Sequence, residues 1–578
     1  MFSLLSYAKQ YKKELILGPV FKLLEAVLEL LLPLYMARLI NQGIQGNNTQ
    51  ALFVTGGKMM LMSIIGLVCV LICQYYASIA SQGFGTELRT ATMTKIYTFS
   101  HKEIDTFGTA TLITRVTNDV SQLQLALAMF IRLVIRAPFL SIGSLVMAYL
   151  IQPKLTLIFV FTLPVFSVIL YLIMTRTSPI YLAVQQQIDQ LNLTIQENLS
   201  GVRVIRAFSK QVSQEKEVAD VSNSLARTYI NVTSWSALLN PLTLLIMNAS
   251  IMGILYFGGI QVNIGNLQAG DVFALITYMT QMLLALIVVS NLVIIFTKAS
   301  VSASRIQEIL DVEPSIMTES RQNSSPWEQP NLIQFSDVSF KYTQESGYAL
   351  KNISFLLEKH HTLGITGPTG SGKSTLIQLI PKFYLPSKGN LLVNNTDITT
   401  LSTGELRKNI AIVPQKSQLF SGTIRSNLAL GMSNVPSDED CWAALSIAQC
   451  TDFVQQLPEQ LDAPVLAGGN NFSGGQKQRL TIARALMRQP ELLILDDSLS
   501  ALDYKTDLAI RTALKETLTQ TTLIIISQRL SSIQDADDIL VLDEGSCVGL
   551  GQHQELLATS PVYYDLAHSQ GLIKEALE

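Results

Sequence analysis

Six long apolar stretches constrain this chain more than any other feature of its sequence. They lie at about 15–40, 59–80, 125–150, 155–175, 240–262 and 272–297. A helix needs about 20 apolar residues to cross the ~30 Å hydrocarbon core of a bilayer. Within that core a helix satisfies its own backbone hydrogen bonds. The sequence therefore predicts an all-α membrane domain of six helices within residues 1–310.

The composition agrees with a membrane protein and excludes two other classes. Charged residues make up 15% of the chain and hydrophobic residues 48%, whereas soluble domains carry about 25% charged residues. Such a high hydrophobic content excludes a disordered chain. The net charge of -3 lacks the basic excess of a nucleic-acid binder. We expect a multi-pass protein of the plasma membrane that does not bind nucleic acid.

The distribution of basic residues predicts how the helices are oriented. Two long polar segments, 81–124 and 176–239, contain many Lys and Arg residues, whereas the short loops contain only Lys58 and Lys154. Cytoplasmic loops carry the excess of basic residues. The long segments and the N-terminus are therefore expected in the cytoplasm. Six spans would leave the chain after residue 300 there as well.

The remainder of the chain has a different pattern. Residues 311–330 are rich in Glu, Ser, Asn and Pro and predict a linker. Residues 331–578 alternate short apolar runs with helical stretches, which predicts an α/β domain with a largely parallel sheet. The predicted strands are Ile333–Phe340, Thr362–Thr366, Ile410–Val413, Leu492–Leu495, Thr522–Ile526 and Ile539–Leu542.

A phosphate-binding loop follows the predicted strand Thr362–Thr366. It matches G-x-x-x-x-G-K-[ST] and opens a predicted helix at Leu376. The loop consists of Gly367, Pro368, Thr369, Gly370, Ser371, Gly372, Lys373, Ser374 and Thr375. Glycines let consecutive backbone N–H groups turn toward a phosphate. We expect Lys373 to reach the β- and γ-phosphates of a nucleotide and Ser374 to ligate Mg²⁺.

A second motif completes this chemistry. The apolar run Leu492–Leu495 ends in Asp496 and Asp497. A buried strand that delivers a carboxylate to a phosphate site holds Mg²⁺ from the side opposite the loop. Asp496 is therefore expected to be a magnesium ligand.

A third motif is a further candidate anion site. It opens the predicted helix Lys477–Met487 and consists of Phe472, Ser473, Gly474, Gly475 and Gln476. Helix N-termini bind anions through free N–H groups. One phosphate is not readily held by two separate Gly loops of the same small domain. The simplest arrangement is two nucleotide-binding domains that face each other, each offering this motif to the other's nucleotide.

With these motifs the whole chain resembles a half-transporter of the ATP-binding cassette (ABC) exporters. This resemblance implies six transmembrane helices followed by an α/β P-loop nucleotide-binding domain, with ATP and Mg²⁺ as cofactors. It implies that Tyr342 stacks on adenine and that Gln415 contacts Mg²⁺ and the transmembrane domain. The family's D-loop would be Ser500, Ala501, Leu502 and Asp503.

Two positions depart from the pattern of active members. Asp497 stands where the family has the Glu that polarises the attacking water, and Gln528 stands where it has a His. A carboxylate one methylene shorter is displaced by about 1 Å, and such a misplacement can cost about 10²-fold in rate. Glutamine cannot carry a proton near neutral pH as histidine can. We expect this chain's own site to bind ATP and hydrolyse it slowly.

The intact motif at 472–476 suggests how such a chain can still act. That motif serves the opposite site, so a partner with complete catalytic residues would supply a competent site. The sequence resembles the degenerate subunit of bacterial heterodimeric multidrug exporters. The resemblance implies a different half-transporter as partner, and hydrophobic or cationic amphiphilic molecules as cargo. Two alternatives remain: a lipid or lipid-linked flippase, and a regulatory or gating subunit with a non-hydrolytic cassette.

Ionisable residues within predicted spans leave a further choice open. Glu25 and Glu29 lie four residues apart in the first span, and Arg132 and Arg136 lie four apart in the third. Such residues are costly in a membrane and face a cavity or a partner. They form either an interhelical ion-pair ladder or an acidic cavity wall for cationic cargo.

Overall fold

The chain folds into two compact units. The computed structural model describes residues 3–316, 327, 329–343, 345–432 and 434–572, without the side chains of Leu182, Ser290 and Asn291. The first unit contains Met1–Lys95 and Ala110–Val312, and the second contains Ile96–Thr109 and Glu313–Glu578. Within the linker predicted at 311–330, residues 317–326 and 328 lie outside the described residues.

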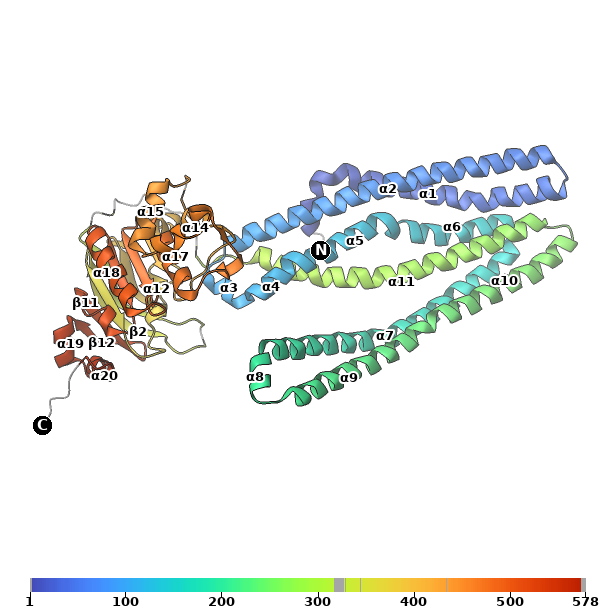
Figure 1. Cartoon of the computed structure of the whole chain (residues 1–578). Coiled ribbons are helices and arrows are strands. Elements are labelled where there is room, and N and C mark those ends of the chain that lie inside the picture. Colours follow the sequence, from blue (N-terminus) through green and yellow to red (C-terminus); the bar gives the residue numbers. More distant parts are fainter. Residues whose placement is uncertain (1–2, 317–326, 328, 344, 433, 573–578) are drawn as a thin grey trace. The chain divides into compact units, whose positions relative to one another are not determined.

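The described part of the first unit consists of helices joined by short turns (Figure 1). Its elements are η1 (Ser3–Tyr11), α1 (Lys12–Arg38), η2 (Leu39–Gln45), α2 (Thr49–Tyr97), α4 (Thr109–Thr114), η3 (Arg115–Asp119), α5 (Val120–Met129), η4 (Phe130–Val134), α6 (Arg136–Ile151), α7 (Pro153–Ser200), α8 (Val202–Ala207), α9 (Gln211–Ala237), α10 (Leu239–Asn263) and α11 (Ala269–Asp311).

Five helical stretches of the described chain are long and apolar enough to cross a membrane. They are Thr49–Tyr97, Thr109–Ile151, Pro153–Ser200, Gln211–Asn263 and Ala269–Asp311. Each contains one of the predicted spans. The remaining predicted span, 15–40, coincides with α1, which is helical but carries Lys22, Glu25 and Glu29. These charges explain why α1 is less apolar than the other five.

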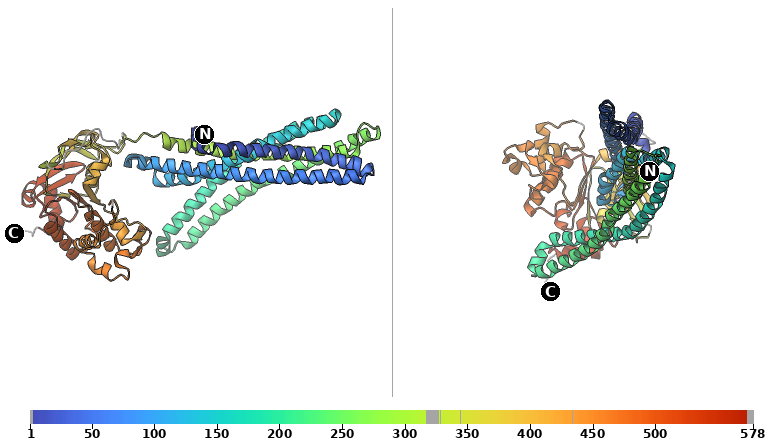
Figure 2. Two further views of the ribbon diagram at one scale, coloured as in Figure 1. Left: turned by 90° about the horizontal axis from the view of Figure 1, so that it is seen from above. Right: turned by 90° about the vertical axis from the view of Figure 1, so that its right-hand side faces the viewer.

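Several of these helices are much longer than a bilayer requires. α7 has 48 residues, although about 20 suffice to cross the hydrocarbon core. α8 reverses the chain, and α9 then packs against α7. Figure 2 shows α7 and α9 as one long hairpin whose turn lies away from the other helices of this unit. The polar segment 176–239 is thus helical, as its sequence indicates.

The second unit is built on a six-stranded sheet with the order β12-β11-β3-β10-β9-β6. Its strands are β3 (Thr362–Thr366), β6 (Ile410–Val413), β9 (Leu492–Asp496), β10 (Thr522–Ile526), β11 (Asp538–Asp543) and β12 (Ser546–Gly551). All neighbouring pairs are parallel except β11 and β12. This sheet is the largely parallel one that the sequence predicts.

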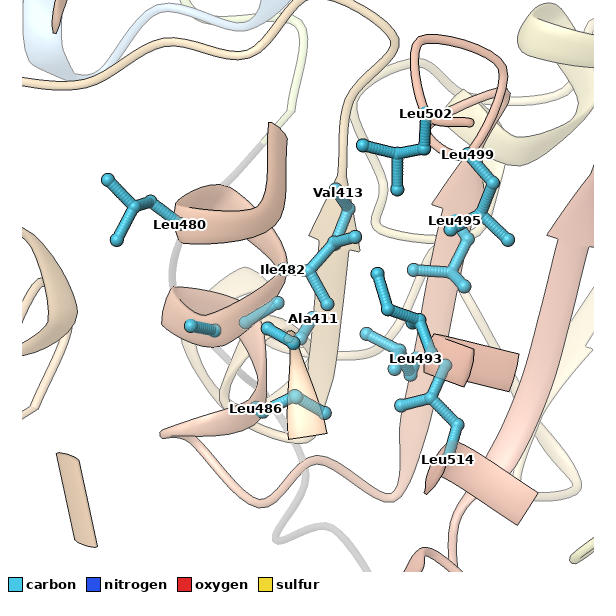
Figure 3. Close-up of a cluster of buried hydrophobic side chains, with 14 of the residues drawn as sticks. Ala411, Val413, Leu480, Ile482, Leu486, Leu493, Leu495, Leu499, Leu502 and Leu514 are labelled. Carbon is cyan, nitrogen blue, oxygen red and sulfur yellow. The ribbon is translucent and has the colours of Figure 1, made fainter. Parts of the chain in front are cut away.

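Both faces of this sheet are buried. Because side chains alternate along a strand, Leu493 and Leu495 of β9 enter one apolar cluster while Leu492 and Ile494 enter another. Figure 3 shows Leu493 and Leu495 together with side chains of β6 and the helix α17 (Gly474–Leu486). Strands buried on both faces consist of continuous apolar runs, and this is why the sequence reveals them.

A second sheet was not foreseen from the sequence. It is antiparallel, with the order β2-β1-β4-β5. Its strands are β1 (Asn331–Phe340), β2 (Leu350–Glu358), β4 (Lys388–Val393) and β5 (Thr396–Asp397). The predicted strand Ile333–Phe340 thus belongs to this separate sheet. The strand β2 alternates buried and exposed residues along most of its length, so it lacks the continuous apolar run of a central strand.

Short helices and one small ribbon complete the second unit. They are α3 (His101–Phe107), α12 (Lys373–Leu379), α13 (Thr403–Lys408), β7 (Gly422–Thr423), α14 (Ile424–Leu428), α15 (Asp438–Ile447), α16 (Thr451–Gln455), η5 (Gln460–Asp462), β8 (Pro464–Val465), η6 (Ala467–Gly469), α17, α18 (Tyr504–Thr517), η7 (Leu530–Ser532), α19 (His553–Thr559) and α20 (Pro561–Ser569).

Although it comes between the helices of the first unit in sequence, α3 belongs to the second unit. At its N-terminus, Glu103 accepts hydrogen bonds from the Ser100 backbone N–H at 2.8 Å and from the Ser100 hydroxyl at 2.5 Å. Its other carboxylate oxygen accepts from the Ser315 N–H at 3.4 Å. Farther along α3, Asp105 accepts a hydrogen bond from Tyr384. These contacts fix α3 within the second unit.

We predict that Glu103→Gln loosens α3. Burial raises the pKa of Glu103, but the hydrogen bonds from Ser100 and Ser315 outweigh it, so this pKa is lowered overall. The ionised Glu103 therefore stabilises the folded protein fully above the pKa of an ordinary glutamate. This stabilisation is lost as the pH falls through the lowered pKa of Glu103. Hydrogen bonds to a charged group contribute about 1.5–3 kcal/mol. Hydrogen exchange of residues 101–107 should accelerate by at least tenfold at neutral pH.

Lys102→Gln provides the matched control, because Lys102 is exposed on the same helix. In this variant, hydrogen exchange of residues 101–107 should be as slow as in the unmodified protein. Equal protection of α3 in both variants would contradict the anchoring role of Glu103.

Candidate active site

The topology of the six-stranded sheet brings the candidate residues to one edge. Parallel strands end at the same edge, and open α/β sheets bind ligands outside the carboxyl ends of their strands. The strand β10 lies between β3 and β9, and β6 lies beyond β9. The segments that follow these strands carry Gly367, Gln528, Asp497 and Gln415. Gly367 and Gln528, which are 161 positions apart in sequence, therefore lie at the same edge of the sheet.

The loop between β3 and α12 depends on glycine. Gly367, Gly370 and Gly372 have φ angles of 145°, 86° and 98°, in the region that residues with a Cβ rarely adopt. A Cβ on Gly367 would lie 2.0 Å from the Leu542 carbonyl oxygen. The loop therefore passes close to β11 and opens α12, whose N-terminus suits an anion.

Lys373 is held at the centre of this loop. Its Nζ donates hydrogen bonds to the Gly367 oxygen at 2.8 Å and the Pro368 oxygen at 2.7 Å. The side chain is buried, and this burial lowers the pKa of Lys373 against the opposing effect of Asp497 and Asp496. The Lys373 amine is thus fixed against the first residues of the loop.

Ser374 and Asp496 meet across this site. The Ser374 hydroxyl donates to Asp496 Oδ1 at 3.2 Å. Burial raises the pKa of Asp496, and the neighbouring Asp497 adds to this effect. Hydroxyl and carboxylate oxygens suit Mg²⁺, which binds one or two carboxylates together with phosphates and water. Among the described residues, no group of three or more His, Cys, Asp or Glu side chains is arranged to hold a metal ion.

Asp497 adopts an unusual backbone conformation. Its φ is 45°, a left-handed value that Asp tolerates better than most residues. Its Oδ2 accepts a hydrogen bond from Gln415 Nε2 at 3.2 Å, and its Oδ1 is buried with no hydrogen-bond partner in the described structure. The Ser500 hydroxyl donates to the Asp497 carbonyl at 2.7 Å. Gln415 thus contacts Asp497. In the described part of the chain, no hydrogen bond joins Gln415 to Ser374 or Asp496.

Tyr342 lies two residues beyond the end of β1, beside Thr375. Its hydroxyl lies 2.9 Å from the Thr375 hydroxyl, and its ring packs edge to face on Tyr384 with centroids 5.3 Å apart. A cavity of about 880 Å³ lies here, lined by Tyr342, Tyr384, Tyr348, Lys102 and Asp105 among others. The contribution of α3 to this cavity could not be read from the sequence.

The motif at 472–476 caps a helix of the second unit. Ser473 Oγ accepts from the Gln476 N–H at 3.3 Å, while Gln476 Oε1 accepts from the Ser473 N–H at 2.8 Å. This capping box fixes the start of α17, three residues before the predicted start. A Cβ on Gly474 would meet no atom within 4 Å. The N-terminus of α17 is therefore open on the side of Gly474.

The D-loop residues form a turn between β9 and α18. Asp503 caps α18 by accepting from the Thr506 N–H at 3.1 Å. Arg529 donates to the carbonyls of Leu502 and Ser500, each at 3.3 Å. Sequence reasoning missed this role of Arg529, although its place directly after Gln528 could have suggested it.

In the first unit, the candidate residues Glu25, Glu29, Arg132 and Arg136 do not all form ion pairs with one another. Arg136 lies 2.7 Å from Glu29 and 3.7 Å from Glu25. Lys22 lies 2.5 Å from Glu25. Arg132 does not pair with either glutamate and donates to the Ser78 hydroxyl at 2.9 Å. Arg136 alone therefore forms the interhelical contacts with Glu25 and Glu29 that an ion-pair ladder would share between Arg132 and Arg136.

An apolar cavity lies elsewhere in the first unit. Its volume is about 930 Å³, and its lining is almost wholly apolar, with Leu4, Phe84, Leu123, Phe130, Val289 and Phe296 among the contributors. By contrast, Tyr278, Met279 and Met282 are fully buried and pack within an apolar cluster. Sequence periodicity alone could not separate cavity residues from packing residues.

Comparison with known proteins agrees with this architecture. The family model of the ABC transporter transmembrane region matches residues 15–308, and the ABC transporter model matches residues 350–500. An uncharacterized ABC transporter ATP-binding protein of Mycobacterium tuberculosis is 33% identical over 98% of this chain and 97% of its own length. A multidrug resistance ABC transporter ATP-binding and permease protein of Lactococcus lactis is 30% identical over 95% of this chain and 92% of its own.

The fold has a counterpart among solved structures. A bacterial Atm1-family ABC exporter with ATP bound superposes with a TM-score of 0.82 and 23% identity, covering 98% of this chain and 99% of that one. The matched models account for the membrane helices and for the phosphate-binding loop with its neighbouring strands. The chain belongs to the ABC transporters, with a transmembrane region and an ATP-binding domain arranged in the fold of an ABC exporter.

Proposed function

We propose that this chain is one half of a heterodimeric exporter that uses ATP to move hydrophobic or amphiphilic compounds across the membrane by alternating access. Its own site binds ATP and hydrolyses it slowly. The motif at 472–476 completes a competent site whose catalytic residues come from a different half-transporter. The observation that carries this proposal is the pair Asp497 and Gln528 beside an otherwise complete phosphate site.

Several groups suited to binding a nucleotide support this proposal. The loop 367–372 presents backbone N–H groups, Lys373 adds a fixed positive charge, and Tyr342 offers an aromatic face for the base. Ser374 and Asp496 would hold Mg²⁺ between them. When bound, Mg²⁺ neutralises charge on the phosphates. Long occupancy of this site is therefore expected.

The groups needed to activate water are weaker. The short side chain of Asp497 is engaged by Gln415 at 3.2 Å. A general base must reach the proton it removes within about 3 Å, and a carboxylate drawn toward Gln415 is less free to do so. Gln528 can donate a hydrogen bond to a γ-phosphate but cannot carry a proton. Binding without fast turnover follows from these two substitutions.

Relatives and cavities support the cargo class. A relative from Lactococcus lactis is named a multidrug resistance transporter, and the apolar cavity of about 930 Å³ suits an apolar molecule of drug size. A lipid flippase shares this apolar chemistry. Transport assays with fluorescent lipids and with amphiphilic dyes in the same vesicles distinguish the two.

We predict unequal effects of substitutions at the two sites of the assembled pair. Asp497→Asn should lower ATPase activity by no more than about twofold, because this site contributes little turnover. Changing the partner's catalytic Glu to Gln should raise the barrier by ~3 kcal/mol, about 10²-fold in rate. Asp497→Glu combined with Gln528→His should increase hydrolysis at this chain's site. Steady-state ATPase of the reconstituted pair measures all of these.

Gly475→Asp should be as damaging as the partner's substitution, because it places a carboxylate against the γ-phosphate of the opposite site. The added Cβ has only ordinary contacts, with Leu502 Cδ2 at 3.6 Å, so the variant should fold. Gly475→Ala is the matched control and should retain most activity. Equal losses of ATPase activity from Asp497→Asn and from the partner's substitution would contradict the asymmetric model.

The ionisable residues of the spans lead to a separate prediction. Because Glu25 and Glu29 already pair with Lys22 and Arg136, we propose that they stabilise the helix bundle. The side chains of the Arg136–Glu29 pair are 25% and 30% exposed, so removing one partner should cost less than the roughly 3 kcal/mol of a fully buried pair. Arg136→Met should therefore lower the thermal midpoint of the purified transporter by several degrees. Arg132→Met, the control, should lower it less.

Export assays complete this test. Glu25→Gln combined with Glu29→Gln should reduce export of cationic and neutral compounds equally, since the loss acts through stability. A selective loss for cationic compounds, with an unchanged thermal midpoint, would instead support an acidic cargo wall.

A further inference from the structure

The C-terminal helix α20 is bonded to the loop that carries Gln528. Gln570 Oε1 accepts a hydrogen bond from the Leu530 N–H at 2.8 Å, and Gln570 Nε2 donates to the Gln528 carbonyl at 2.8 Å. One amide group thus satisfies a donor and an acceptor two residues apart. We refer to residues 527–530 as the switch loop and to these two bonds as the Gln570 clamp.

The end of α20 is built so that Gln570 has a fixed position. The Gly571 N–H bonds to the His568 oxygen at 3.0 Å, and the Leu572 N–H bonds to the Ala567 oxygen at 3.1 Å. With Gly571 at φ 70°, this is a Schellman ending in which Gln570 is the C-cap residue.

The body of α20 is also held in place, by buried side chains and a hydrogen bond. Tyr563 and Ala567 are fully buried. The hydroxyl of Tyr563 lies 2.6 Å from His553 Nδ1 of the preceding helix. The clamp therefore joins the switch loop to an anchored helix and not to a free tail.

The switch loop is linked to Asp497 through the D-loop. Its Arg529 bonds to the Ser500 and Leu502 carbonyls. The Ser500 hydroxyl donates to the Asp497 carbonyl at 2.7 Å. A continuous set of hydrogen bonds thus leads from Gln570 through the switch loop and the D-loop to Asp497, whose left-handed backbone needs such support.

We propose that Gln570 is a positioning residue for ATP hydrolysis: its clamp fixes the backbone of Gln528 and, through Arg529, that of Asp497. The inference rests on the hydrolytic roles proposed above for these two residues. Gln570 itself does not touch the nucleotide. Its loss should slow turnover at this chain's site without changing how tightly that site holds ATP.

Two substitutions separate the two bonds of the clamp. Gln570→Met has nearly the same length and loses both bonds. Gln570→Glu keeps an acceptor for the Leu530 N–H but cannot donate to the Gln528 carbonyl. Gln554→Met is the matched control, because Gln554 is exposed on the neighbouring helix α19.

The first measurement is hydrogen exchange of the complete transporter without nucleotide. In Gln570→Met the Leu530 amide should exchange about fivefold faster, the factor that one ordinary hydrogen bond contributes. In Gln570→Glu and Gln554→Met it should retain its protection. Unchanged exchange in Gln570→Met would show that the clamp does not hold the loop, and would overturn the inference.

The second measurement follows an azido-ATP with radiolabel on its γ-phosphate, crosslinked to this chain in the assembled pair. Gln570→Met should slow the loss of the γ-label about tenfold, less than the roughly 10²-fold that a 1 Å misplacement can cost. Labelling by the α-phosphate form should stay constant. Gln570→Glu should be intermediate.

The outcomes distinguish this inference from the proposed function. Faster exchange with unchanged loss of label would overturn the positioning role and leave the proposed function intact. A weaker α-label together with a lower thermal midpoint would indicate a structural role and would also overturn it. Failure of the asymmetric model would appear in the unmodified chain as rapid loss of the γ-label, before any substitution at Gln570.

Discussion

The parallel core of the six-stranded sheet is the constraint on which the site depends, because it brings four distant segments to one edge. The strands β3, β10, β9 and β6 are neighbours, and their two faces are covered by separate apolar clusters. Burial on both faces prevents a strand from slipping without moving its side chains between the clusters. The loop at 367–372, Gln528, Asp497 and Gln415 therefore keep their relative positions.

Much of this architecture follows from the sequence. Continuous apolar runs reveal β3, β6, β9 and β10, since central strands need no polar face. The phosphate-binding loop can also be predicted from the sequence, because its glycines must adopt positive φ angles. The membrane helices can be predicted from the length of their apolar stretches. In each case a short stretch of sequence is enough to predict the element.

What the sequence could not predict depends on contacts between distant residues. The strand β2 alternates buried and exposed residues, and nothing local shows that it pairs with β1 in a separate sheet. The pairing of Arg136, and not Arg132, with Glu29 depends on how two helices are rotated. The clamp by Gln570 joins residues about 40 positions apart. No pattern of local spacing indicates such contacts.

The helix α3 shows how the membrane helices and the nucleotide site are linked along the chain, because α3 contributes residues to the cavity beside Tyr342. Asp105 lines that cavity and binds the hydroxyl of Tyr384, while burial and this contact raise the pKa of Tyr384. Since α3 follows α2 after three residues, the chain passes directly from a membrane-spanning helix to the surroundings of the proposed adenine site.

The proposed asymmetry of the two sites is tested most directly by the fate of bound nucleotide during one turnover of the proposed pair, with both chains unmodified. The transporter is loaded with azido-ATP carrying a γ-label, allowed one turnover, and crosslinked. We predict that this chain retains the γ-label while the partner has lost it. Loss of the γ-label from both chains at the same rate would contradict it.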